Sequence, residues 1–504
     1  MLTNRHASRI RGTLSCLDRV LVTGTLPDIC YPEALARELT RRRIRFFDYK
    51  TAFAQPIRDD IRQHAERLAQ ENALEIEHIR RIKAFRKEDR VQAILTERGT
   101  HPGLVHIFSA METCTAFEPR YDKRSGKTFL RPDSGKCLHY YFYFFDPDLG
   151  LCHLRVPTWA PFRLQFCFNG HNWLASRLKR LGIGYQLVDN AFVRLDDFAL
   201  AQRIADRLKP STLHRKLDRF VRRFCPASAA FPAGYHWSIM QVEYATDTVF
   251  KSRDDLAPLY DHLVRSAVHL VRAEHVATFL GRKLDPRYQG EIGNDFNTRI
   301  QGTRIRHQMG PVALKMYDKF GCVLRIETVS NNVSFFKHHR TVEHRDGTSE
   351  VKPAPVKKTI YSLSVLPGIL GACNRRYLEF LSSLDDDSAG RRHLDRLSRS
   401  VRDEKRSYRG INFFDSDERD LLLTIGRGEF NLAGFQVRTL RPFLGQLSGP
   451  QLSRRIKRLL KHRLIKKVAG TYRYYLTRLG RRAITAALRL REGSIIPALA
   501  GLPA

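Results

Sequence analysis

The chain has 504 residues, of which 87 are Lys or Arg and 52 are Asp or Glu, so its formal net charge is +35 and its pI is about 10.2. Such a surplus of positive charge repels itself unless a polyanion is bound, which favours DNA or RNA as the partner. No apolar run reaches the roughly 18 residues of a membrane span, and the first residues lack a signal-peptide core. The sequence therefore predicts no membrane partner and a cytoplasmic, nucleoid-associated protein.

The first predicted region, residues 1–205, mixes helices and strands. Three consecutive strand-like segments are followed by a helix, a strand and a helix, which indicates an antiparallel sheet with helices on one face. The strand-like segments are residues 136–145, 150–157 and 162–168. Aromatic side chains fill positions 140–145; they could stack bases, although alternate members of such a strand more often fill a core. No internal repeat is visible in the sequence.

The second predicted region, residues 206–345, begins with a basic helix over 211–224 and continues into a long strand over 235–250. Because side chains alternate along a strand, Glu243 and Asp247 share one face. Two carboxylates on one face can contribute to a site for a divalent metal ion or to a water network. The alternative is that each pairs with one of the abundant Lys and Arg side chains nearby.

Residues 312–329 are predicted to form a hairpin that turns at Phe320-Gly321. A nucleophile, a carboxylate and several cations then lie on one face above an apolar underside. These residues are Lys315, Tyr317, Lys319, Arg325 and Glu327. They are the groups that phosphodiester chemistry uses, although a sheet face covered by solvated cross-strand ion pairs gives the same pattern.

Three short motifs follow one another in this region: VEYATD at 242–247, MYDK at 316–319 and LRIE at 324–327. This trio resembles the sheet motifs of plasmid and phage rolling-circle replication initiators. Those proteins carry an acid-x-x-x-acid strand, a Tyr-(Asp/Asn)-Lys strand and an Arg-x-Glu strand. The His-x-His pair that many of them use to bind metal is absent from this chain.

The resemblance implies a tyrosine that attacks the DNA backbone and a bound Mg²⁺ or Mn²⁺ ion that polarises the phosphate. Tyr317 would be the nucleophile. The phosphate charge would be held by Lys319 and Arg325, together with Lys315. The implied metal ligands are Glu243, Asp247 and Glu327.

The polar segment 337–358 is predicted to be a loop or flexible hairpin, and residues 346–410 are predicted to be a linker with helices. The last predicted region, residues 411–492, begins with a helix capped by Asp415, and its third helix starts at Ser448 with Pro450 in the first turn. The predicted order of elements is three helices, two short strands and a closing helix. This order is typical of a winged helix-turn-helix domain.

The stretch LLKHRLIKKVAGTYRYYLTRLGRRAI at 459–484 resembles the wing and flanking helix of MarR-type bacterial regulators. The resemblance implies that the third helix enters the major groove and that the wing touches the backbone or the minor groove. Residues 451–490 contain thirteen Lys or Arg and no Asp or Glu, which favours nucleic acid over a merely solvated face, although winged helices also bind proteins. The predicted DNA contacts are Arg454, Arg455, Lys457, Arg458 and Arg473.

The sequence thus predicts an α+β protein, with antiparallel-sheet core domains, flanking helices and a C-terminal winged helix-turn-helix domain. We expect a nucleic-acid-binding protein of a mobile genetic element with a metal-dependent strand-nicking core, acting on DNA or else on RNA. The alternative is a non-catalytic winged-helix transcriptional regulator or RNA-binding protein, and a homodimer is compatible with either. Walker-A and dinucleotide-type glycine fingerprints are absent, which disfavours ATP-driven and nicotinamide-dependent reactions, and no Gly-x-Ser-x-Gly or His-Glu-x-x-His motif is present.

Overall fold

A computed structural model gives the fold of the chain as two compact units, Met1–Asp385 and Asp386–Ala504. The residues that it describes are 2–80, 85–283, 288–299, 302–385, 388–403 and 406–500. The predicted α+β class is confirmed in its coarse form, because the chain combines a large, mostly antiparallel sheet with flanking helices. None of the helices in the described ranges has the length and apolar character needed to span a membrane.

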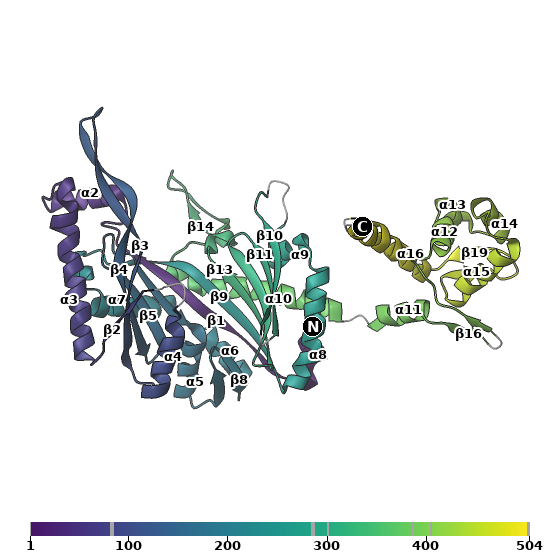
Figure 1. Cartoon of the computed structure of the whole chain (residues 1–504), viewed down its shortest axis with the longest axis horizontal. Helices are drawn as coiled ribbons and strands as arrows, with labels where there is room; N and C mark the ends of the chain where they lie inside the picture. The colour runs from purple at the N-terminus through teal and green to yellow at the C-terminus, as the bar shows by residue number, and fades with distance from the viewer. Residues whose placement is uncertain are drawn as a thin grey trace. The chain divides into compact units, whose positions relative to one another are not determined.

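The first unit is built on one eleven-stranded sheet (Figure 1). Its strands lie in the order β10 (Ile292–Arg299), β11 (Gly302–Met309), β12 (Val312–Lys319), β13 (Val323–Ser330), β9 (His236–Phe250), β1 (Ile10–Thr25), β6 (Leu164–Asn169), β5 (Gly150–Pro157), β4 (Lys127–Asp146), β3 (Gly103–Asp122) and β2 (Ile76–Ile79). Only β2 pairs in parallel with its neighbour. The predicted regions 1–205 and 206–345 therefore share a sheet, because β1 and β9 pair in its centre.

The order of elements in the first unit repeats. Each half contains, in this order, a first strand, two helices, a four-stranded meander and a helix, and the first strand pairs with the last strand of the meander. Further elements are inserted in each half: β2 and α4 (Lys87–Arg98) before the meander of the first, and β14 (Lys337–Glu343) and β15 (Ser349–Pro355) after the meander of the second. In the first half these are β1, α2 (Pro32–Arg41), α3 (Gln55–Glu71), β3 to β6 and α5 (Gly170–Arg180). In the second they are β9, α8 (Arg253–Leu270), α9 (Ala273–Phe279), β10 to β13 and α10 (Leu366–Asp385). β1 and β9 join the halves antiparallel to each other.

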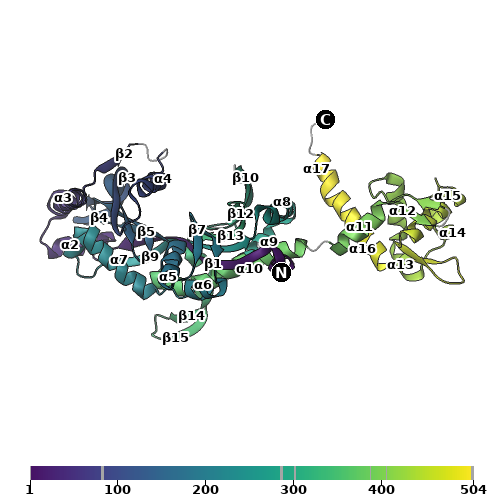
Figure 2. The same cartoon turned by 90° about the horizontal axis from the view of Figure 1, so that it is seen from below.

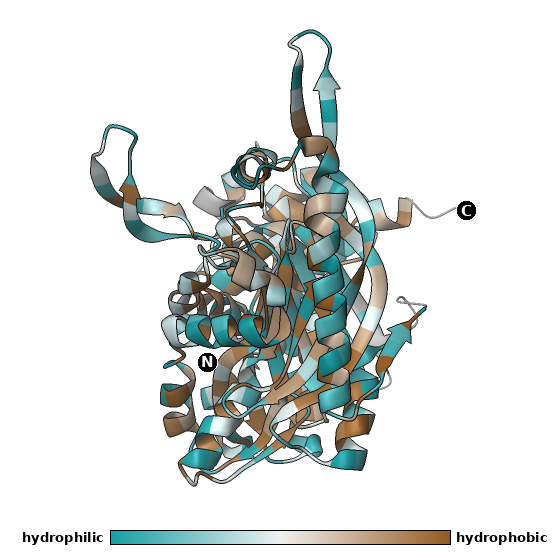
Figure 3. Ribbon diagram, turned by 90° about the vertical axis from the view of Figure 1, so that its left-hand side faces the viewer, coloured by the Kyte–Doolittle hydropathy of each residue, from teal (hydrophilic) through white to brown (hydrophobic). Residues whose placement is uncertain are grey.

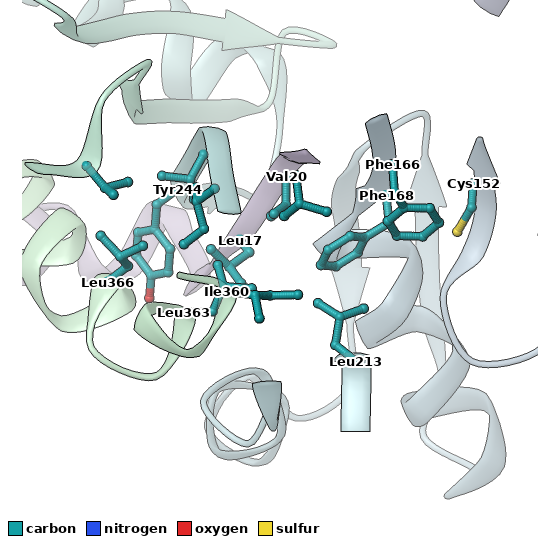
Figure 4. Close-up of a cluster of buried hydrophobic side chains, with 14 of the residues drawn as sticks. Leu17, Val20, Cys152, Phe166, Phe168, Leu213, Tyr244, Ile360, Leu363 and Leu366 are labelled. Carbon is teal, nitrogen blue, oxygen red and sulfur yellow. The ribbon is translucent and has the colours of Figure 1, made fainter. Parts of the chain in front are cut away.

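One face of the sheet packs under most of the helices, and this is where the main hydrophobic core lies (Figure 2). Figure 4 shows part of it, with Leu17 and Val20 of β1, Phe166 of β6, Tyr244 of β9 and Leu366 of α10. Further contributions come from α6 (Phe198–Ala205) and α7 (Pro210–Phe224). A smaller core lies under α4 (Lys87–Arg98) on the opposite face.

Both faces of β4 are thus covered, and this settles the role of the aromatic run at 140–145. Residues 140 to 144 are buried, at no more than 6% exposure each, so these rings fill cores and do not stack bases. Covering on both sides explains why the run is continuous and does not alternate with polar residues.

Three local features differ from what the sequence pattern predicts. The pattern over 185–195 predicts one strand, but these residues form a hairpin, β7 (Tyr185–Val188) and β8 (Ala191–Leu195), because Asp189 adopts a positive φ of 51° and reverses the chain. The pattern over 44–49 predicts a strand, but residues 46–54 form short helical turns. The stretch 287–301 is expected from its sequence to be irregular, but described residues within it form β10.

Two hairpins project from the first unit. β3 and β4 continue their pairing out to Asp122 and Lys127, and the turn that joins them, at the top of Figure 3, is hydrophilic. The second hairpin, β14 (Lys337–Glu343) and β15 (Ser349–Pro355), pairs only with itself. The polar segment 337–358, predicted as a loop or flexible hairpin, therefore contains both strands of this hairpin.

The second unit has its own core. Its elements are α11 (Ser388–Ser398), β16 (Val401–Asp403), β17 (Arg406–Tyr408), α12 (Ser416–Ile425), α13 (Gly428–Ala433), α14 (Val437–Leu440), α15 (Gly449–Lys461), β18 (Ile465–Lys467), β19 (Tyr474–Leu476), α16 (Arg478–Leu490) and α17 (Ile496–Ala500). Asp415 caps α12 by accepting a hydrogen bond from the Glu418 amide, and Ser448 and Gln451 form a capping box on α15. Membership of the winged-helix class stays a prediction.

Candidate functional site

A polar cluster lies on the face of the sheet opposite the α10 core, around β9, β12 and β13. It begins with an irregularity in β1. The register of β1 against β9 shifts between Leu17 and Val20, both of which point into the main core. A bulge of this kind adds one residue to its strand, so that Asp18 and Arg19 together stand opposite the single residue Glu243 of β9. Asp18 and Arg19 therefore both face the polar cluster.

The predicted alternation along β12 and β13 agrees with the contacts. Leu314 and Met316 lie in the main core. On the other face, the Lys315 ammonium donates a hydrogen bond of 2.9 Å to Oε2 of Glu327. The Tyr317 hydroxyl donates a hydrogen bond of 3.5 Å to the same carboxylate. The hairpin turn is also where the sequence places it, because Phe320 and Gly321 both have positive φ.

Arg325 lies at the centre of a fully buried ion cluster. Its guanidinium donates two hydrogen bonds of 2.6 Å to Asp247 and one of 3.0 Å to Asp18. It also donates to the Asn190 carbonyl and lies 3.1 Å from Nε2 of His171. Asp247 and Arg325 thus form a buried ion pair, and their metal-binding and phosphate-binding roles stay predictions.

The electrostatics agree with ionised groups in this cluster. Burial opposes ionisation of Asp18 and Asp247, but the charges of His171 and Arg325 outweigh burial and hold the pKa of both carboxyls below its ordinary value. Burial also opposes the charged form of His171, yet these two carboxylates raise its pKa well above the ordinary value. Opposite charges thus compensate one another inside the sheet.

Three acidic side chains next to this cluster could hold a metal ion. Asp18, Glu243 and Glu327 each offer an oxygen, and these atoms lie within 4.8 Å of one another. Burial raises the pKa of Glu327 to about 7, with Lys315 opposing the rise and Glu243 adding to it. Burial likewise raises the pKa of Glu243. A set of carboxylate oxygens is the donor type that Mg²⁺, Mn²⁺ and Ca²⁺ prefer.

Lys315 marks where a cation is already favoured. Its ammonium lies 2.9 Å from Glu327 and 4.0 Å from Glu243, between two of the three carboxylates. A divalent ion bound there would displace this ammonium, whose flexible stem lets it move to a nearby anion. The arrangement can therefore hold either a lysine or a metal between the same oxygens.

The other predicted residues of this region are placed differently. Lys319 pairs with Asp189, at 3.0 Å, and with Asn190, both in the β7–β8 turn, and so anchors that turn. Tyr317 lies beside the acidic residues, and burial, reinforced by Glu327, raises the pKa of its hydroxyl well above the ordinary value. Its phenol would need a base close by to act as a nucleophile.

Sequence reasoning missed Asp18 and His171. The indication for Asp18 was present, because the consecutive Asp18 and Arg19 interrupt the apolar run LDRVLV inside a predicted strand. Two adjacent polar residues in a strand that is otherwise buried are typical of a bulge. Nothing comparable marks His171, which reaches the cluster from the first turn of α5.

In the second unit, the five predicted DNA contacts fall into two groups. Arg454, Lys457 and Arg473 are exposed. Arg455 and Arg458 on α15 instead pair with acids of α12, at 2.9 Å from Asp417 and 2.5 Å from Glu418, respectively. Arg458 is only 9% exposed, so its charge fastens α15 to α12 and the structure gives it a structural role in place of the predicted DNA contact.

Comparisons with known proteins add little. No protein-family model matches the chain. No curated protein matches it either. One solved structure, the crystal structure of the di-domain ARO/CYC BexL from the BE-7585A biosynthetic pathway, is 9% identical and has a TM-score of 0.14, with 59% of this chain and 94% of that chain covered. So slight a likeness carries no argument about fold or function.

Proposed function

We propose that the chain is a nucleic-acid-binding protein of a mobile genetic element, and that the polar face of its sheet breaks a phosphodiester bond in DNA with the help of Mg²⁺ or Mn²⁺. The observation that carries the proposal is the convergence of Asp18, Glu243 and Glu327 beside Tyr317 and Lys315. The net charge of +35 supports a polyanionic substrate. The resemblance of the three motifs to replication initiators supports the reaction class.

The chemical step assigns one task to each residue. The Tyr317 oxygen attacks the phosphorus, the phosphorus–O3′ bond breaks, and the 3′ oxygen leaves as a hydroxyl after taking up a proton. The phenolic proton passes to Glu327, which accepts the Tyr317 hydrogen bond and whose pKa of about 7 suits a base at neutral pH. Asp18 and Glu243 would hold the metal ion, which polarises the phosphate when it is bound. Lys315 would then be free to neutralise a phosphate oxygen.

The second unit would bring the protein to its DNA. We assign α15 to the major groove and the β18–β19 hairpin to the backbone, in the manner of winged-helix proteins. This assignment is supported by the exposed Arg454 and Lys457 on α15 and by Arg473 between the two strands.

The test is Mn²⁺-dependent nicking of single-stranded and supercoiled DNA by the wild type and by Tyr317→Phe. The wild type should cut and leave protein joined to the 5′-phosphate, whereas Tyr317→Phe should do neither. Tyr121→Phe, at an exposed tyrosine near the β3–β4 turn, is the matched control and should cut normally. Equal cutting by Tyr317→Phe would remove the tyrosine from the mechanism.

A non-catalytic DNA- or RNA-binding regulator is the second candidate. It is favoured by Lys315, which already offsets part of the charge on Glu327 without any metal. Under this alternative, binding to duplex DNA or to RNA would persist, while no divalent ion would produce cutting by the wild type.

A further inference from the structure

Two arginines on β11 extend the polar face beyond the acidic residues. Arg306 lies directly opposite Lys315 of β12, and Arg304 lies two residues earlier on the same side of the strand. Ile305 and His307 point to the other side, where Ile305 is in the main core and His307 contacts Tyr377 of α10. The alternation therefore places both guanidinium groups next to Lys315 and Tyr317.

Both arginines lack partners among the described residues. The Nε atoms of Arg304 and Arg306 are buried and make no hydrogen bond. Neither side chain forms an ion pair within the described ranges, although Asp295 of β10 stands directly opposite Arg306. The Asp295 carboxylate instead accepts a hydrogen bond of 3.1 Å from Asn297. A half-buried charged group without a partner is costly, and an anion would satisfy it.

We infer that Arg304 and Arg306 bind two neighbouring phosphates of one DNA strand and so position a phosphate beside Lys315 and Tyr317. The inference rests on the proposed function and adds a binding site for its substrate. Two side chains on the same face of a strand are about 7 Å apart, so each arginine can take a different phosphate. The planar guanidinium fork matches a phosphate with two parallel hydrogen bonds.

The experiment measures binding of a labelled oligothymidylate to the full chain in EDTA, at several NaCl concentrations. Each phosphate contact on a single strand contributes about 0.7 to the slope of log K against log salt, so Arg304→Gln/Arg306→Gln should lower the slope by about 1.4 and weaken binding several-fold. The matched control, Arg41→Gln/Arg45→Gln, removes the same charge from exposed arginines and should keep the wild-type slope.

Arg304→Lys/Arg306→Lys distinguishes the loss of a phosphate contact from a folding defect, because it keeps both positive charges. It should retain the slope but lose part of the affinity. A wild-type slope and affinity in the double glutamine variant, with normal melting temperature, would overturn the inference. EDTA prevents cutting, so this assay measures binding independently of nicking. If the slope is lowered in the variant but the wild type never nicks DNA in Mn²⁺, the arginine site is supported and only the nicking activity is refuted. An RNA oligonucleotide that binds more tightly than oligothymidylate, with equal loss in the variant, would overturn DNA as the substrate.

Discussion

The guanidinium of Arg325 on β13 meets the carboxylate of Asp247 directly across the strand ladder, through two hydrogen bonds of 2.6 Å. The same guanidinium reaches Asp18 on β1. Arg325 therefore ties together the last meander strand of the second half and the two first strands that join the halves. This buried charge network fixes β1, β9 and β13 relative to one another, and so it also fixes the positions of Glu243 and Glu327 on the same face.

Replacing Arg325 with Met should therefore destabilise the first unit by about 3–5 kcal/mol, because it leaves buried carboxylates without their cation. The free energy of unfolding in urea is the measurement. Arg345→Met in the turn of the projecting β14–β15 hairpin removes an exposed arginine and should change stability by less than about 0.5 kcal/mol. Equal stability of the two variants would mean that Asp18 and Asp247 do not depend on Arg325.

A second prediction concerns the pH dependence of stability. Burial raises the pKa of Glu327 to about 7, above its ordinary value of 4.5, so between these pH values the folded state keeps a proton that the unfolded state has lost. Stability contributed by this group is therefore present at low pH and is lost as pH rises towards 7. Glu327→Gln cannot ionise, so its melting temperature should exceed that of the wild type increasingly from pH 5 to pH 8.

Adding Mn²⁺ at pH 8 should narrow this difference, because the ionised Glu327 carboxylate lies beside Asp18 and Glu243 and adds to the attraction for the metal, whereas the variant lacks that charge. Glu350→Gln on the β14–β15 hairpin is the control, because Glu350 is exposed. A constant difference between Glu327→Gln and the wild type at all pH values would show that Glu327 is already ionised at pH 5.

How far the sequence could predict this site depends on the range of the interactions. The alternation on β12 and β13 is local, and it placed Lys315, Tyr317 and Glu327 on one face correctly. The pairing of Arg325 with Asp247 is not local, since it requires β13 and β9 to be neighbours in the sheet. Without knowledge of that strand order, the acidic Asp247 and the basic Arg325 fitted the prediction of a site that binds a metal ion and a phosphate.

The repeated order of elements escaped detection for a related reason. A strand, two helices and a meander need only the right pattern of apolar residues, and many different sequences supply it. In the second unit, by contrast, caps at Asp415 and Ser448 are local features, and the helices begin where these residues predicted them. The sequence did not distinguish Arg458 from Lys457, because burial depends on the acids that α12 presents.

A third prediction tests whether Lys315 occupies the position of a cation. Lys315→Gln removes a positive charge 2.9 Å from Glu327, so it should raise the affinity for Mn²⁺ by about tenfold, the effect of roughly 1.4 kcal/mol. Glu243→Gln should lower it. Titration calorimetry on the two variants and the wild type gives the comparison. Unchanged Mn²⁺ affinity in both variants would place any metal away from these residues.

The last prediction separates the two groups of basic residues in the second unit. Arg454→Ala/Lys457→Ala removes exposed charge from α15, so it should weaken duplex DNA binding and lower the salt slope by about 1.8 without a change in melting temperature.

Arg458→Ala should lower the stability and leave the salt slope unchanged. It removes one of the two cations that pair with the buried Glu418 carboxylate, and the other, Arg409, lies 2.9 Å away. A loss of about 2 kcal/mol or more in stability is expected there. Gel-shift titrations at several salt concentrations, with melting curves on the same samples, measure both effects. If Arg454→Ala/Lys457→Ala bound duplex DNA like the wild type, α15 would not be the recognition helix, since Arg454 and Lys457 are its exposed basic residues.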